Sequence, residues 1–264
     1  MAIDQGVYAL LESGPAKAVD RTFRRLQSYF LDLLDELEGD GALLKTDVFN
    51  INRADRLIEK MRAELGQLGF NEVIDAELDS LKEMITAIKS ESEDLGIGKQ
   101  FSDTSQEMIR SLFRRSSTAT FNVAHQVAQD LDDLVHDSIT GMVDFPQITR
   151  ALVNKLKFRQ DQMHSLVSST LHNFTRQVRT NNARESGVEW YLYDGPQDTI
   201  NREFCAHCVG RRFTLEMLEG MAGSFGRSLK LVPVAVWLGG YRCRHELVPL
   251  VDAKDLKQYE IGAR

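Results

Sequence analysis

The sequence is poor in proline and in cysteine, and both shortages narrow the class of protein. None of the five prolines in the 264 residues lies between Pro15 and Pro146. Proline breaks helices and central strands, so a proline-free stretch of this length favours long helices. The three cysteines all follow residue 200. They are too few for the disulfide framework that holds many small secreted proteins together.

Long apolar runs are also missing. No segment approaches the roughly 20 apolar residues of a membrane span. The first eleven residues lack the basic region and apolar core of a secretion signal. We therefore expect synthesis in a reducing cytoplasm and no membrane partner. With 42% hydrophobic and 27% charged residues, the chain has enough apolar side chains for a packed core.

The charge is uneven along the chain. The formal net charge is −7, which argues against a nucleic-acid binder by charge alone. Residues 201–264 carry ten basic and seven acidic side chains, whereas the first 200 residues carry 22 and 32. An acidic body repels phosphate, so extensive DNA contact would need a local basic face.

Apolar residues recur at steps of three and four through most of the first 180 residues, as on one face of a helix. The pattern predicts helices that begin near Asp20, Asn52, Asn71, Ser105 and Pro146, with glycine-containing breaks between them. Long helices with short breaks are typical of a bundle or an extended helical assembly. The apolar faces could form the core or contact a second copy, and the sequence does not separate these alternatives.

The pattern changes near Gly187, where a small mixed region begins. The alternating aromatic run 188–193 predicts a strand. Asp198 is placed to cap a helix over 199–208, and Thr214 to cap another. The apolar stretch 231–238 is expected to be extended, and Pro249 marks the edge or end of a final strand.

The predicted fold class is therefore mainly α. We expect a helical domain over 1–183, which makes assembly and partner contacts, and a small α+β module over 184–264.

Three cysteines and one histidine of this module have metal-ligand spacing. Cys205 and Cys208 form C-x-x-C, and Cys243 and His245 form C-x-H after a glycine turn. Two local pairs of soft ligands are what a tetrahedral zinc site requires. Zinc would also stabilise a module with little core of its own.

Other interpretations of these residues stay open at this point. His207 is a competing ligand beside the first pair. Reduced structural cysteines are one alternative, and a disulfide from Cys243 to Cys205 or Cys208 is another. A redox C-x-x-C centre is a further one, although no thioredoxin-like βαβ pattern surrounds it.

Several pieces in order resemble a known family. They are an aromatic strand ending in Tyr193-Asp194-Gly195, then Asp198-Thr199 with Arg202 and Cys205, then Gly210-x-x-Phe213, then Gly239-Gly240-Tyr241-Arg242-Cys243-Arg244-His245, and last Leu247-Val248-Pro249. This order resembles the C-terminal module of phage head morphogenesis proteins, the Mu F-like minor head protein family, over about residues 187–251. Members often end in Cys-Arg-Cys, where this chain has His245.

The resemblance implies a structural minor virion protein of a tailed phage, located at the portal or head interior. It would act in head assembly, DNA packaging or ejection, with portal, capsid or internal proteins as partners. Asp198, Arg202, Gly210, Phe213 and Gly240 would have structural roles in the module. The helical body carries no motif of its own, so its role follows only by analogy.

Two other functions compete with this one. A zinc-dependent DNA-binding module would use a basic face, for which the candidates are Arg211, Arg212, Arg227, Arg242 and Arg244. A treble-clef nuclease would need a catalytic histidine and a second metal, and the spare histidines are few. Asp198 and Arg202 could also simply pair on one helix face. We expect no enzymatic activity.

Overall fold

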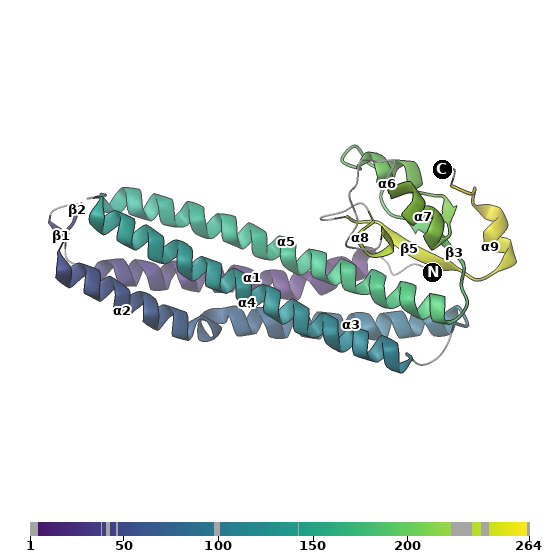
Figure 1. Ribbon diagram of the computed structural model, residues 1–264, viewed down its shortest axis with the longest axis horizontal. Coiled ribbons are helices and arrows are strands. Elements are labelled where there is room, and N and C mark those ends of the chain that lie inside the picture. The colour runs from purple at the N-terminus through teal and green to yellow at the C-terminus, as the bar shows by residue number, and fades with distance from the viewer. Residues whose placement is uncertain are drawn as a thin grey trace. The chain divides into compact units, whose positions relative to one another are not determined.

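The fold is described from a computed structural model, which describes residues 5–37, 39–40, 43–45, 47–97, 101–141, 143–222, 234–238 and 243–262. Most of these residues are helical, as predicted (Figure 1). The long helices are α1 (Gln5–Asp35), α2 (Val48–Glu64), α3 (Asn71–Asp94), α4 (Asp103–Thr140) and α5 (Phe145–Glu185). No helix in this part of the chain is long and apolar enough to cross a membrane.

Helix α1 begins 15 residues before the predicted start and contains Pro15. Proline has no N–H, so it cannot donate to the carbonyl four residues earlier, that of Leu11. The Ser80 hydroxyl of α3 donates to this carbonyl at 2.8 Å. A hydroxyl from a distant part of the sequence thus replaces the missing helical bond, and the prediction that the helix begins near Asp20 was wrong.

A π-helical turn, η1 (Gly66–Phe70), joins α2 to α3. Gly69 has a φ of 128°, a backbone conformation that is essentially restricted to glycine. A Cβ at this position would lie 2.3 Å from the Thr22 hydroxyl oxygen of α1. Glycine is therefore required at this position both for the backbone conformation and for the close approach of α1.

The chain divides into two compact units. Unit 2 comprises residues 12–79 and 114–167, and unit 1 comprises residues 1–11, 80–113 and 168–264. In unit 2, α1, α2, α4 and α5 contribute to one apolar core that includes Phe23, Phe30, Met61 and Leu131. A short antiparallel pair, β1 (Gly39–Asp40) with β2 (Leu43–Leu44), connects α1 to α2.

Unit 1 contains the small mixed region and parts of α3, α4 and α5. Its sheet has the order β4-β3-β5, with both pairs antiparallel. The central strand β3 (Trp190–Asp194) pairs with β4 (Arg212–Phe213) on one side and with β5 (Glu246–Leu250) on the other. Pro249 lies in an edge strand, as its missing N–H predicts.

Short helices complete the module: α6 (Glu203–Cys208), α7 (Leu215–Ala222), α8 (Val234–Trp237) and α9 (Ala253–Gln258). The hydroxyl of Thr214 accepts the Met217 N–H at 3.2 Å, which confirms the predicted cap of α7. The sequence suggested a domain boundary after residue 183. In the structure, the module packs into the same compact unit as residues 80–113 and 168–183.

The expectation of an extended segment over 231–238 was wrong for its second half, because residues 234–237 form α8. Residues 231–233 lie outside the described residues. The Glu219 carboxylate of α7 accepts the Val234 N–H at 2.6 Å, and Val234, Ala235 and Leu238 are buried in the core. A short apolar run fits a strand as well as a buried helical turn, so the sequence pattern alone does not predict which of the two forms.

Gly69→Ala should lower the free energy of unfolding by about 3 kcal/mol, because it adds backbone strain and an overpacked contact with Thr22. Gly220→Ala is the matched control. Gly220 lies in α7 with open space around its Cα, so alanine there should stabilise by up to about 1 kcal/mol. Urea denaturation measures both variants. Equal stability of Gly69→Ala and the wild type would contradict the assigned role of Gly69.

Candidate metal centre

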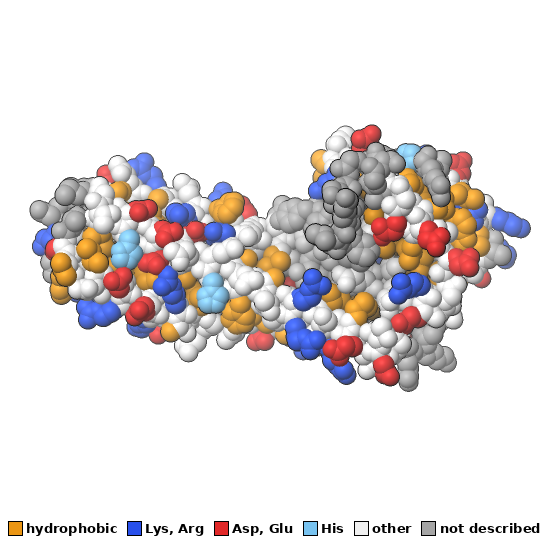
Figure 2. Space-filling view, viewed as in Figure 1, with side chains coloured by type: hydrophobic (Ala, Val, Ile, Leu, Met, Phe, Trp, Pro, Cys, Tyr) orange, Lys and Arg blue, Asp and Glu red, His pale blue; other side chains and the backbone are white. Residues whose placement is uncertain are grey.

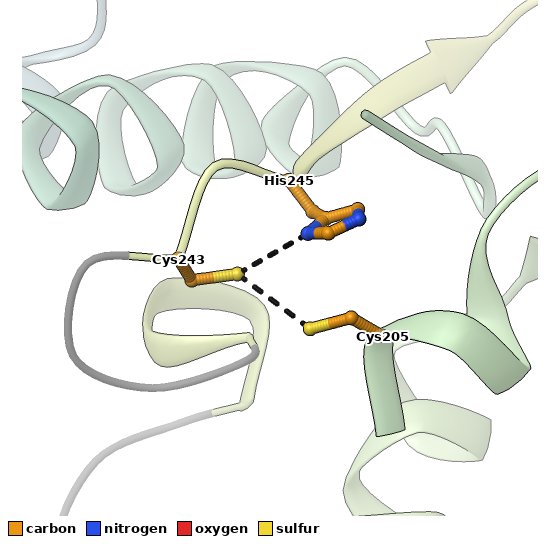
Figure 3. Close-up of side chains that lie close together, drawn as sticks. All are labelled: Cys205, Cys243 and His245. Carbon is orange, nitrogen blue, oxygen red and sulfur yellow. Dashed lines mark hydrogen bonds between the residues drawn. The ribbon is translucent and has the colours of Figure 1, made fainter. Parts of the chain in front are cut away.

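Three of the four predicted ligands lie together in unit 1: Cys205, Cys243 and His245 (Figure 3). All three side chains are buried, and their ligand atoms lie within 4.8 Å of one another. The Sγ atoms of Cys205 and Cys243 are 3.8 Å apart, and Cys243 Sγ lies 3.6 Å from His245 Nδ1. None of the three cysteines forms a disulfide. This group could hold a metal ion.

Different elements bring the three residues together. Cys205 lies in α6, whereas Cys243 and His245 immediately precede β5. The end of β3 must approach His245 closely. Gly195 allows this, because a Cβ there would lie 2.6 Å from Cδ2 and 2.9 Å from Cα of the histidine, and its φ of 150° suits glycine.

The backbone fixes the direction of the His245 ring. Its Nε2 lies 2.9 Å from the carbonyl oxygen of Pro196, which can only accept a hydrogen bond. Nε2 therefore carries the proton in the neutral ring, and Nδ1 presents its lone pair toward Cys243. Metal-binding histidines are commonly oriented by this kind of contact through the second ring nitrogen.

Tyr193 of β3 contacts two members of the group. Its hydroxyl donates to Cys205 Sγ at 3.3 Å, and its ring centroid lies 5.3 Å from that of His245. Burial raises the pKa of Tyr193 well above its usual value, so the hydroxyl remains a donor.

The pKa of Cys243 is lowered, first by its hydrogen bond with Cys205 and further by the positive charge of Arg176, against the opposing effect of burial. The environment of Cys243 therefore favours a thiolate.

Cys208, the fourth predicted ligand, is not part of the described metal-binding group. It is the last residue of α6 and lies fully buried in the apolar core of unit 1. Burial raises the pKa of its thiol to about 12, so it stays protonated and inert. Both cysteines of the C-x-x-C pair lie on α6, and of the two only Cys205 belongs to the group. His207 is likewise outside the group.

The backbone of the ligand segment is held by Arg176 of α5, which is only 3% exposed. Its guanidinium donates to the carbonyl oxygens of both Cys243 and His245, the latter at 2.9 Å. Because the planar guanidinium has fixed donor directions, one side chain sets the spacing of the two carbonyls. Arg176 thus positions two of the three candidate ligands without touching their ligand atoms.

One turn further along α5, Arg179 forms a buried ion-pair network. It contacts Glu91 of α3 at 2.8 Å and Glu246 of β5 at 2.5 Å, and all three side chains are at most 7% exposed. Burial raises the pKa of Glu91, although Arg179 opposes the shift. Glu246 directly follows His245, so this network fixes the start of β5 next to the candidate ligands.

Asp198 does not cap α6 as predicted, because α6 begins at Glu203 with Arg202 in the cap position. The Asp198 carboxylate instead accepts the Ile200 N–H at 3.2 Å and pairs with Arg244 at 2.7 Å. The hydrogen bond from Arg244 is the main cause that lowers the pKa of Asp198. Asp198 thus contacts the ligand segment, which lies 46 residues away in the sequence.

The other predicted residues fall into three groups. Gly210 has a φ of 78° and donates its N–H to the Tyr193 carbonyl at 2.9 Å, and Phe213 is fully buried beside β3, so both have structural roles. Arg212 lies over the Trp190 ring at 4.8 Å, and Arg211 is half-buried. Arg227, Gly240 and Arg242 lie outside the described residues.

Arg176, Arg179 and Glu91 were not predicted from the sequence. The available signal was a pair of arginines three residues apart within the apolar face of α5, between the buried Phe174 and Ala183. Charges in such positions are almost never buried without partners, so they point to a buried ion pair or polar contact.

Arg179→Met should lower the free energy of unfolding by about 3–5 kcal/mol, because it leaves two buried carboxylates without their cation. Adding Glu91→Gln and Glu246→Gln to this variant should restore part of the loss. Arg110→Met is the control, since Arg110 forms an exposed pair with Glu107 and should change stability by about 0.5 kcal/mol or less. Chemical denaturation that finds Arg179→Met as stable as Arg110→Met would refute the network's role.

Comparisons of this chain with protein-family models, with curated proteins and with solved structures found no match. We therefore infer the role of the metal centre from its own side chains.

Proposed function

We propose that this chain is a structural minor head protein of a tailed phage, whose C-terminal module is held together by a zinc ion bound to Cys205, Cys243 and His245. Two spacings, between Cys205 Sγ and Cys243 Sγ and between Cys243 Sγ and His245 Nδ1, are the observation that carries the proposal. Zinc binds thiolate sulfur at about 2.3 Å and imidazole nitrogen at about 2.0–2.1 Å. At tetrahedral angles, two sulfurs then lie about 3.8 Å apart, and a sulfur and a nitrogen about 3.6 Å.

The distances in the structure are 3.8 Å between the sulfurs and 3.6 Å between Cys243 Sγ and His245 Nδ1. A disulfide would need the sulfurs about 2.05 Å apart, and it would leave His245 without a role. The contacts around the group also support a metal, because Tyr193, the Pro196 carbonyl and Arg176 fix the ligands from outside.

The order of motifs supports the assignment to a head protein. The residues that carry the resemblance to the Mu F-like family include Tyr193, Gly210, Phe213 and the Cys243–His245 segment. Tyr193, Phe213 and Cys243 belong to one buried cluster of unit 1. A module whose characteristic residues lie around a metal centre fits a structural role better than a catalytic one.

The helices support an assembly role of the remaining chain. Helices of 31, 38 and 41 residues, as in α1, α4 and α5, are typical of assembly elements. We propose portal, capsid or internal head proteins as partners, a virion location, and self-association through exposed helix faces. Exposed apolar side chains such as Phe158 (64% exposed) are candidate contacts on α5.

A DNA-binding role has less support. Arg212 is engaged with Trp190, and Arg244 is paired with Asp198. On the face drawn in Figure 2, basic and acidic side chains are interspersed rather than gathered into one basic surface. Phosphate recognition along a duplex requires such a surface.

The wild-type protein should carry about one zinc per chain, whereas Cys243→Ser and His245→Ala should each lose most of it. Cys208→Ala is the matched control and should keep its zinc, because this thiol lies in the core. Metal analysis of the purified proteins measures the content. Removing zinc with a chelator should lower Tm in the wild type and in Cys208→Ala, since bound metal stabilises the folded state.

Two outcomes would overturn the zinc assignment. If the wild-type protein purified from zinc-supplemented cells contains no zinc, the zinc assignment is wrong. Loss of zinc in Cys208→Ala with the fold retained would instead favour the four-ligand site predicted from the sequence.

The phage role predicts that the chain is a component of mature particles. Mass spectrometry of purified particles from a producing host should detect it in low copy number relative to the major capsid protein. It should remain with the heads when tails are removed. A chain found only in the soluble fraction of the lysate would contradict the virion assignment and leave the zinc site unaffected.

A further inference from the structure

The candidate centre supplies three protein ligands, whereas zinc in proteins takes four. Structural zinc sites fill all four positions with protein side chains, and sites with an exchangeable ligand keep one position open. Cys208 belongs to the same buried cluster as Cys205 and Cys243, but its sulfur is not among the ligand atoms that lie within 4.8 Å of one another. Among the described residues the group therefore supplies three ligands, and the fourth position is open to another group.

A pocket of about 210 Å³ adjoins the three ligands, and they form part of its lining. The rest of the lining consists of Ile200, Asn201, Arg202 and Arg244. The ligand side chains are buried, yet Ile200 is 74% exposed and the Arg244 side chain 39% exposed. The pocket thus leads from the solvent to the metal position. Its volume is below the roughly 300–1,000 Å³ of pockets for drug-sized ligands, so it suits a small group.

The charges of the metal centre and of the pocket lining indicate which kind of fourth ligand the pocket would bind. Zinc with two thiolates and one neutral imidazole has no net charge, so an anionic fourth ligand gives the centre a charge of about −1. Arg202 and Arg244 line the pocket, and the ion pair of Arg244 with Asp198, made through one terminal nitrogen at 2.7 Å, holds its guanidinium in place. A guanidinium donates a stronger, charge-assisted hydrogen bond to the carboxylate oxygen that does not bind the metal than to a neutral acceptor.

We infer that the metal centre has an open coordination position that binds a carboxylate from outside the chain, with Arg244 and Arg202 holding its second oxygen. This inference rests on the proposed zinc site. In the absence of such a ligand, water occupies the position. The centre is then a docking point for an acidic group as well as a structural clasp.

The test uses the full chain loaded with Co²⁺, whose visible absorption depends on its ligands. Thiolate-to-cobalt charge transfer reports binding of the metal, and the d–d bands report the fourth ligand. Acetate, added at constant ionic strength, should shift the d–d bands saturably and leave the charge-transfer band in place. Arg244→Gln should weaken acetate binding by about tenfold, because one charged hydrogen bond is lost. Arg211→Gln is the control and should not change it, because Arg211 is not part of the lining.

The outcomes separate this inference from the zinc proposal. Cobalt that binds through thiolates but does not respond to acetate would overturn the open position and leave the metal site standing. A d–d spectrum that changes in Cys208→Ala would do the same, since Cys208 would then be the fourth ligand. A response to orthophosphate but not to acetate would overturn the carboxylate assignment. Failure to bind either cobalt or zinc would overturn both proposals.

Discussion

The guanidinium of Arg176 is the contact on which the candidate metal centre depends. It is buried, and taking a cation out of water costs several kcal/mol unless its donors are satisfied. The carbonyl oxygens of Cys243 and His245 provide two of the acceptors. The stabilisation is mutual, because a segment with little regular structure receives a fixed backbone from a long helix. The ligand spacing that suits zinc follows from this backbone rather than from the two ligand side chains alone.

Neighbouring side chains also fix the segment that carries the candidate ligands. Arg179 lies three residues after Arg176 and binds Glu246 at the start of β5, while Glu91 binds its other side. Two successive arginines of α5 thus contact three of the four residues from Cys243 to Glu246. Opposite them, Gly195, the Pro196 carbonyl and Tyr193 at the end of β3 fix His245 and Cys205. The small sheet is therefore organised around the ligands, which is consistent with a module that gains much of its stability from a bound metal.

The structural features that depend on local sequence patterns were predicted correctly. The apolar spacing of α3, α4 and α5 and the Thr214 cap follow from periodicity and capping chemistry, and the structure confirms them. The failures all depend on distant contacts. Helix α1 continues through Pro15 because Ser80 satisfies the Leu11 carbonyl, and Asp198 pairs with Arg244, 46 residues away. The ligand set was predicted as two local pairs. The C-x-H pair holds, whereas Cys208 lies in the core, because a helical C-x-x-C directs its second thiol according to the packing of α6.

We infer that Arg176 preorganises the candidate metal ligands, and that the spacing of these ligands depends on it. The most direct measurement is a competition titration of zinc affinity in Arg176→Met, with Arg184→Met on the same helix as the control, since the hydrogen bond of Arg184 to Asn181 is exposed and local. Outer contacts of this kind change metal affinity by about 10–100-fold, so Arg176→Met should weaken zinc binding by that factor while Arg184→Met binds like the wild type. A folded Arg176→Met protein with unchanged zinc affinity would contradict the claim.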